Sequence, residues 1–248
     1  MATPMTAEQQ LDAFRRWEVP FREVDGWRTR NRNHMGPWGG VNGLMVHHTG
    51  SDSSNQVALL RDGRSDLPGP LAQWGLAQDG VLWLIGNGRC NHAGKGDPDV
   101  LDAVINENYG DYPPTDNQAT VDGNTHFYGV EIWYSGTHGM TKSQYSTLLR
   151  LGVAIIHFHG WTEKSVIGHG EWQPGKWDPG YANGKMMDMN AVRNDIADVK
   201  AGLDANVDGE RDSATPPPSI PETPQPRIVT VTTGDTIVFP GGGKVEVK

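Results

Sequence analysis

Cysteine is almost absent from this sequence, since Cys90 is the single one among 248 residues. A lone cysteine excludes an intramolecular disulfide and a zinc site built from several thiolates. Apolar runs are short, and none approaches the roughly 20 residues that a membrane-spanning helix needs. The opening residues lack the basic and apolar regions of a secretory signal. We therefore expect a protein that is made in the cytoplasm without a signal of its own and does not insert into a membrane.

Basic residues are also few, with 21 Lys and Arg against 30 Asp and Glu, which gives a net charge of -9. Binding to nucleic acid depends on a basic face that neutralises phosphates, so nucleic acid is not the expected partner. Glycine (32), proline (17) and tryptophan (9) are plentiful. Glycine and proline predict many turns, while tryptophans outside the core usually line a groove that binds a ligand. The chain is long enough for one well-buried domain with appendages.

Apolar periodicity and turn signals predict a chain in which helices and strands alternate. Capping boxes at residues 6–9 and 141–144 predict the starts of two helices, and Gly160 predicts the end of the second. The Asp79-Gly80 pair between two apolar runs is the strongest short-range signal for a β-hairpin. We expect further helices at residues 55–62, 98–108 and 189–201, strands at residues 43–48, 71–78, 81–85 and 126–134, and a loop at residues 109–125.

The composition changes after residue 203, where acidic residues precede Thr215-Pro216-Pro217-Pro218. A proline-rich stretch of this kind is typical of an extended, semi-rigid linker. The segment beyond it alternates well enough for two short strands around a run of glycines, but about 20 residues cannot form a core of their own. We divide the chain into an N-terminal helical extension (1–24), a main catalytic domain (25–203), a linker (204–226) and a short β tail of unknown role (227–248).

The segment 166–180 places His169 and Asp178 in a loop rich in glycine, proline and tryptophan, and His47 and His48 end another apolar run far upstream. Two imidazoles and one carboxylate form a three-ligand zinc set that leaves the fourth position open for water, as catalytic sites do. Neighbouring side chains of a strand point to opposite faces, so we expect only one of the paired histidines to join this set. The pattern does not say which face holds the metal. The competing interpretation is a hydrogen-bonded histidine at the end of a strand.

The sequence resembles the zinc-dependent N-acetylmuramoyl-L-alanine amidases of the type-2 amidase and peptidoglycan-recognition superfamily in four segments that occur in order, Val46-His47-His48-Thr49, Asn91-His92-Ala93-Gly94, Gly129-Val130-Glu131-Ile132 and His169…Lys176-Trp177-Asp178-Pro179-Gly180. The resemblance covers residues 25–200. It implies one Zn²⁺ per chain with His47, His169 and Asp178 as ligands. It also implies that Lys176 stabilises the developing oxyanion and that Glu131 holds and activates the attacking water.

Chemistry supports Glu131 independently of the resemblance. A carboxylate within an apolar strand is costly unless it is paired or protonated, so such a residue is a candidate for function. The competing interpretation places it on a solvated strand face. One departure from the family concerns Ala72, which stands where several phage members carry a tyrosine and which leaves Glu131 as the expected water activator.

The resemblance further implies a fold and a reaction. The expected fold is α/β, with a central mixed β-sheet of about five or six strands flanked by helices. The expected reaction is hydrolysis of the amide bond between N-acetylmuramic acid and L-alanine in bacterial peptidoglycan, carried out by a phage endolysin that degrades the host cell wall. Candidates for substrate contact are His92, Trp74, Trp172 and Trp177. The last two are equally expected to anchor the loop within residues 166–180 that carries His169 and Asp178, which we call the ligand loop. No protein partner is inferred.

Three alternatives stay open on the sequence alone. A recognition protein would bind peptidoglycan in the same groove without cutting it, but the complete ligand set favours an enzyme. An amidase that recycles muropeptides in the cytosol would also lack a signal, and only the proline-rich spacer favours the endolysin. A zinc peptidase that cleaves within the stem peptide would use similar metal chemistry but does not match the order of the four segments.

Overall fold

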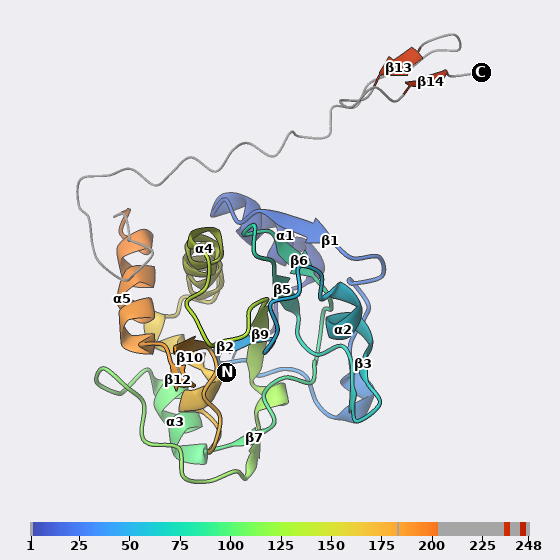
Figure 1. Cartoon of the computed structure of the whole chain (residues 1–248). Helices are drawn as coiled ribbons and strands as arrows, with labels where there is room; N and C mark the ends of the chain where they lie inside the picture. Colours follow the sequence, from blue (N-terminus) through green and yellow to red (C-terminus); the bar gives the residue numbers. More distant parts are fainter. Residues whose placement is uncertain (1, 183, 203–235, 239–243, 247–248) are drawn as a thin grey trace. The chain divides into compact units, whose positions relative to one another are not determined.

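A six-stranded mixed sheet forms the centre of the computed structural model, which describes residues 2–182, 184–202, 236–238 and 244–246 (Figure 1). The four adjacent strands at one side of this sheet are parallel to one another, and a single antiparallel pair, β5 with β6, follows them. The strand order is β1 (Phe21–Glu23), β6 (Leu82–Leu84), β5 (Trp74–Leu76), β9 (Phe127–Ile132), β2 (Gly43–His48) and β10 (Val166–Gly168). The predicted α/β class with a central mixed sheet is confirmed.

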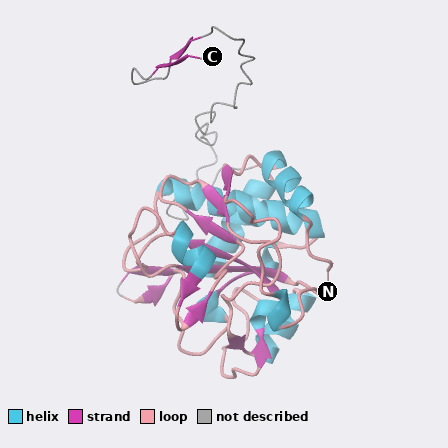
Figure 2. Ribbon diagram, turned by 90° about the vertical axis from the view of Figure 1, so that its right-hand side faces the viewer, coloured by secondary structure: helices cyan, strands magenta, loops and turns pink. Residues whose placement is uncertain are grey.

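Helices lie on both sides of the sheet, as Figures 1 and 2 show. The predicted capping boxes are confirmed, because the Thr6 and Thr141 side chains accept from the backbone of Gln9 and Gln144. Gly160 ends the longest of these helices in the left-handed conformation that glycine adopts without strain. The described helices are α1 (Ala7–Arg16), α2 (Val57–Asp62), α3 (Pro98–Asn106), α4 (Lys142–His159) and α5 (Met189–Lys200).

Alternation along β2 separates the apolar core into two layers. Leu44 and Val46 belong to the large cluster that α1, α4 and α5 complete, whereas Met45 packs with Phe127, Ile167 and residues of α3. Side chains of successive strand residues point to opposite faces. The side chain of the next odd-numbered residue, His47, therefore lies on the α3 face of the sheet. The predicted N-terminal extension contributes Leu11 and Phe14 of α1 to the large cluster.

The remaining elements are short and connect the main ones. The predicted Asp79-Gly80 hairpin is confirmed, with strands shorter than predicted because regular pairing stops at Leu76 and Leu82. The predicted loop 109–125 contains one short strand, because residues 121–122 pair with residues 95–96. These short elements are β3 (Gly63–Arg64), β4 (Leu67–Pro68), β7 (Lys95–Gly96), β8 (Val121–Asp122), β11 (Gly180–Ala182) and β12 (Lys185–Met186), with 3₁₀ turns at Asn33–Met35, Gly123–Thr125, Glu163–Ser165 and His169–Glu171.

A second unit, Pro218–Lys248, contains the antiparallel pair β13 (Thr236–Val238) and β14 (Lys244–Glu246). The predicted linker (204–226) and the rest of the predicted tail lie outside the described residues. The proposed division of the chain into extension, domain, linker and tail stays a prediction. Among the helices that the structure describes, none combines the length and the apolar character that a membrane crossing requires.

Candidate metal centre

Strand register brings three of the predicted site residues to one edge of the sheet. His47 in β2 is directly opposite Glu131 in β9. On the other side of β2, Gly168 of β10 pairs with Val46, so that His169 follows at the level of His47. All three strands are parallel, and parallel strands end at the same edge of a sheet. Residues separated by more than 120 positions in the sequence therefore become neighbours at this edge.

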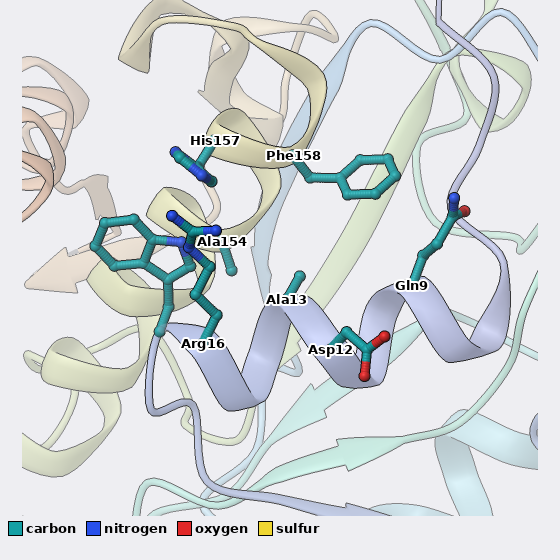
Figure 3. Close-up of a pocket in the computed structure, with 8 residues that line it drawn as sticks. Gln9, Asp12, Ala13, Arg16, Ala154, His157 and Phe158 are labelled. Atoms are coloured by element: carbon teal, nitrogen blue, oxygen red, sulfur yellow. The ribbon is translucent and has the colours of Figure 1, made fainter.

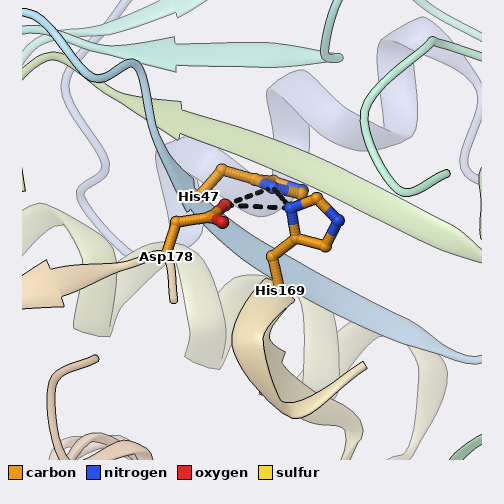
Figure 4. Close-up of side chains that lie close together, drawn as sticks. All are labelled: His47, His169 and Asp178. Carbon is orange, nitrogen blue, oxygen red and sulfur yellow. Dashed lines mark hydrogen bonds and ion pairs between the residues drawn. The ribbon is translucent and has the colours of Figure 1, made fainter. Parts of the chain in front are cut away.

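The side chains of His47, His169 and Asp178 converge on one point, as Figure 4 shows. His47 Nδ1 lies 3.1 Å from His169 Nδ1 and 3.0 Å from Asp178 Oδ2. His169 Nδ1 lies 3.0 Å from the same carboxylate oxygen. Both imidazoles are buried, while 14% of the Asp178 side chain is exposed. We refer to these three residues as the triad.

The triad carries the protonation states that bind a metal. Burial and the neighbouring His169 lower the pKa of His47 to about 4, so this imidazole is neutral near pH 7. Burial alone would raise the pKa of Asp178, but the imidazoles of His169 and His47, each 3.0 Å from its carboxylate, hold it below its usual range. Metal ions bind the neutral imidazole and the ionised carboxylate. No proton has to leave His47 or Asp178 near pH 7 before a metal binds.

The donor set fits Zn²⁺ in composition and in size. Zinc favours imidazole nitrogen and carboxylate oxygen, and three protein ligands are typical of catalytic sites. A triangle with sides of 3.0 to 3.1 Å has its centre about 1.8 Å from each corner, which is slightly shorter than Zn–N and Zn–O distances of roughly 2.0–2.2 Å. Lone pairs that face one another at this distance repel unless a cation or a shared proton lies among them. One zinc ion per chain therefore fits the residues present.

A buried ion pair fixes the turn that carries His169. Glu171 accepts from the backbone N–H of Gly168 at 3.0 Å and from both terminal nitrogens of Arg193 in α5, at 2.9 and 3.0 Å. Arg193 also donates to the carbonyl of Val166 in β10. Arg193 was not among the residues predicted for the site, because an arginine within an amphipathic helix usually lies on its solvated face. A signal was present, since Arg193 lies four residues after apolar Met189 and three before apolar Ile196, which places it beside the buried stripe of the helix.

His48 occupies the opposite face of β2 and holds the other end of the ligand loop. Its Nδ1 accepts from the backbone N–H of Gly180 at 2.8 Å, two residues after Asp178. Tyr134 donates to the carbonyl of the same glycine at 2.6 Å, and the Trp177 ring packs edge-on against His48 at 4.6 Å. The sequence left open which of the two histidines joins the site. In the structure His47 belongs to the triad, and His48 supports the loop that carries Asp178.

Glu131 lies beside the triad with a buried, unpaired oxygen. Its Oε2 has no hydrogen-bond partner among the described residues. Burial, together with the negative charge of Asp178, raises the pKa of Glu131 well above its usual value. Lys176 is exposed in the ligand loop, and its positive charge opposes this shift. A carboxyl group with a raised pKa next to a cation is suited to accept and return a proton.

A family model for N-acetylmuramoyl-L-alanine amidases matches residues 37–181, which include the triad, Glu131 and Lys176. This match spans more than half of the chain. The chain belongs to the N-acetylmuramoyl-L-alanine amidase family. The resemblance stated from the four sequence segments is thereby confirmed. A comparison with curated protein sequences gave no match.

Solved structures of several amidases resemble this chain at low sequence identity. The N-acetylmuramoyl-L-alanine amidase LysC from Clostridium intestinale is 16% identical, with 70% of this chain and 96% of that chain covered and a TM-score of 0.47. The endolysine amidase LysCS from the same organism is 17% identical, with 64% and 86% covered and a TM-score of 0.44. AmpDh3 from Pseudomonas aeruginosa, in complex with an anhydromuramic pentapeptide, is 18% identical, with 73% and 66% covered and a TM-score of 0.44.

The four residues that the sequence suggested for substrate contact lie in different surroundings. Trp74 is fully buried on the α4 face of the sheet, where it donates to Gln10. Trp172 is fully buried against Phe127 and donates to the carbonyl of Ala93 at 2.8 Å. His92 is buried directly behind His47, and only Trp177 is partly exposed. Of the four, only Trp177 therefore stays a candidate for contact with a ligand.

A groove of about 360 Å³ lies elsewhere on the first unit of the chain, Met1–Pro217, between α1 and α4 (Figure 3). Its lining includes Arg16, Trp17, His157 and Phe158, and none of the predicted site residues. The two helices cover the face of the sheet opposite the triad. The His157 ring stands edge-on to that of Trp17, with 5.4 Å between the ring centroids. This groove has no connection with the metal centre.

Proposed function

We propose that this chain is a zinc-dependent N-acetylmuramoyl-L-alanine amidase that cleaves the bond between the lactyl group of N-acetylmuramic acid and L-alanine in peptidoglycan. The observation that carries the proposal is the convergence of His47, His169 and Asp178 within 3.1 Å of one another at the edge of the sheet where Glu131 of β9 pairs with His47. Membership of the amidase family supports the same reaction.

The proposed division of labour follows from the chemistry of the residues. The triad would hold the Zn²⁺, which would supply a Lewis acid that lowers the pKa of the attacking water toward about 7 and polarises the scissile carbonyl. Glu131 accepts the proton of the attacking water and delivers it to the leaving amine of L-alanine. Lys176 places a positive charge where the carbonyl oxygen becomes negative. Trp177, which packs on His48 beside the loop, offers an aromatic face to the sugar or peptide.

Mass spectrometry of digested peptidoglycan tests this proposal. Purified protein is incubated with isolated cell walls, with and without a zinc chelator, and the soluble products are identified. We expect free stem peptides that begin with L-alanine, and we expect them to be absent under chelation. Protein that binds the wall without releasing fragments would instead support a recognition protein. Fragments cut within the stem peptide would support a zinc peptidase.

For the biological role we propose a phage endolysin that acts on the host wall after release from the cytoplasm. The proline-rich segment at residues 215–218, which follows the amidase domain, favours this role over muropeptide recycling. Turbidity of permeabilised bacteria separates the two. An endolysin clears the suspension rapidly, whereas a recycling amidase leaves the walls intact and acts on soluble muropeptides.

A further inference from the structure

A second histidine stands directly behind the ligand His47. The Nε2 atom of His47, which points away from the triad, lies 3.0 Å from Nδ1 of His92. Nε2 of His92 in turn lies 3.1 Å from the backbone carbonyl oxygen of Phe127. Both rings are buried, with 1% of His47 and 8% of His92 exposed. A continuous buried line thus connects a backbone carbonyl to the metal centre.

The backbone carbonyl of Phe127 determines which nitrogen donates in each hydrogen bond of this line. A carbonyl oxygen only accepts, so Nε2 of His92 must carry the hydrogen. A neutral imidazole has one N–H, which leaves Nδ1 of His92 as an acceptor. His47 must therefore donate from its Nε2, and its own Nδ1 is left with a lone pair that faces His169 and Asp178.

We propose that His92 is a positioning residue that holds His47 as the Nε2–H tautomer and aims its Nδ1 at the metal. The inference rests on the proposed zinc function of the triad and adds to it a residue that touches neither metal nor substrate. Acceptors for the distal N–H of a ligating histidine fix its tautomer and orientation, and their loss typically weakens metal binding by about 10–100-fold. The role differs from the substrate contact expected for His92 from the sequence.

The surrounding chain is built to keep the His92 ring in place. The side-chain oxygen of Asn124 accepts from the backbone N–H groups of His92 and Ala93, at 2.8 and 2.9 Å. Trp172 donates to the carbonyl of Ala93 at 2.8 Å. Position 129 in β9 has to be glycine, because a Cβ there would lie 2.6 Å from Nδ1 of His92. The strand thus leaves room for the ring between itself and His47.

The other histidine ligand has a different kind of support. Nε2 of His169 lies 3.1 Å from the side-chain oxygen of Gln173, in the same turn and only partly buried. Water can replace such an acceptor when it is removed. The buried site of His92 offers no comparable access, so removal of its acceptor is expected to cost more than removal of the Gln173 acceptor. Gln173→Leu is therefore the matched control.

Two substitutions at His92 separate the acceptor from the bulk of the ring. In His92→Asn the amide oxygen can take the place of Nδ1 as acceptor for His47, whereas His92→Leu fills the space without an acceptor. Zinc affinity is measured by competition with a chromophoric chelator, and thermal unfolding of the metal-free proteins confirms that each variant is folded. We expect His92→Leu to raise the Kd for zinc by about 10–100-fold, with His92→Asn closer to the wild type and Gln173→Leu less affected than His92→Leu.

Ring ¹⁵N chemical shifts of the metal-free wild type give a readout that needs neither zinc nor substrate. We expect His47 to be the Nε2–H tautomer, and we expect a tautomer mixture in His92→Leu. An Nδ1–H tautomer of His47 in the wild type, or unchanged zinc affinity in a folded His92→Leu variant, would overturn the role of His92. A wild type that shows the expected tautomer but binds no zinc would instead refute the proposed function and leave the tautomer assignment intact.

Discussion

Replacement of Glu131 by glutamine tests whether a buried carboxylate is retained for chemistry at the expense of stability. In the unfolded chain this carboxyl group ionises above a pKa of about 4.3. In the folded protein, burial and the charge of Asp178 raise its pKa well above that value. Neutral Glu131 therefore makes its full contribution to the free energy of unfolding below about pH 4. This contribution is lost as the pH rises toward the folded-state pKa.

The magnitude follows from the missing partner of Glu131 Oε2. A buried polar group without a partner costs about 1–3 kcal/mol, and a charged one costs more. Glutamine keeps the size of the side chain but cannot ionise. We therefore expect the metal-free Glu131→Gln protein to exceed the wild type in free energy of unfolding by about 1–3 kcal/mol at pH 8, and the excess to disappear near pH 4. Each unit of pKa displacement corresponds to about 1.4 kcal/mol, so the pH series measures the displacement directly.

Urea denaturation followed by tryptophan fluorescence, with a chelator present, provides the measurement between pH 4 and pH 8. The same preparations are loaded with zinc and assayed for release of stem peptides, which we expect the variant to lose. Glu163→Gln, in the turn before β10, is the control for loss of a glutamate outside the centre. A variant that is less stable than the wild type at pH 8, or one that keeps full activity, would refute the reasoning.

Three further substitutions probe separate parts of the centre. Asp178→Ala is expected to abolish zinc binding and wall lysis, measured by calorimetry and turbidity, and full activity would contradict the ligand assignment. Lys176→Ala is expected to keep zinc but to lower kcat, because a charge that stabilises the developing oxyanion is lost; an unchanged kcat would remove Lys176 from the mechanism. Arg193→Met is expected to lower the free energy of unfolding by about 3–5 kcal/mol, because Glu171 becomes a buried charge without its partner. Denaturation of the metal-free protein measures this loss, and a value below about 1 kcal/mol would show that Glu171 finds another partner or is protonated.

Local signals predicted the elements well. The capping boxes at Thr6 and Thr141 satisfy backbone N–H groups within a few residues, so that the sequence alone contains both partners of each hydrogen bond. The same holds for the Asp79-Gly80 turn, where Gly80 adopts a positive φ of 86°. The candidate metal ligands were also accessible from the sequence, through the resemblance in four segments. Two of them, His47 and His169, meet because the parallel strands β2 and β10 end at the same edge of the sheet.

Features that depend on strand register, or on which face of the sheet a side chain lies, could not be predicted in this way. Alternation in β5 shows that Trp74 and Gly75 point to opposite faces, but it does not say which face carries the metal centre. The structure places Trp74 in the core with Phe14 and Tyr128, on the other side of the sheet. The position of His92 was also missed, although Gly129 within an apolar strand was a signal of close approach by another group.

The consecutive histidines show how core packing determines the chemistry of this site. His47 belongs to the triad, whereas His48 accepts a hydrogen bond from the backbone N–H of Gly180 and thereby holds the loop that carries Asp178. A shift of β2 by one residue would exchange the two imidazoles, since every side chain of the strand would change face. Leu44 and Val46 are fully buried in the cluster with α4, and the same shift would move them out of that cluster. The apolar residues that precede the pair therefore select which histidine meets the metal, and the function of the site depends on packing against the helices on the opposite face.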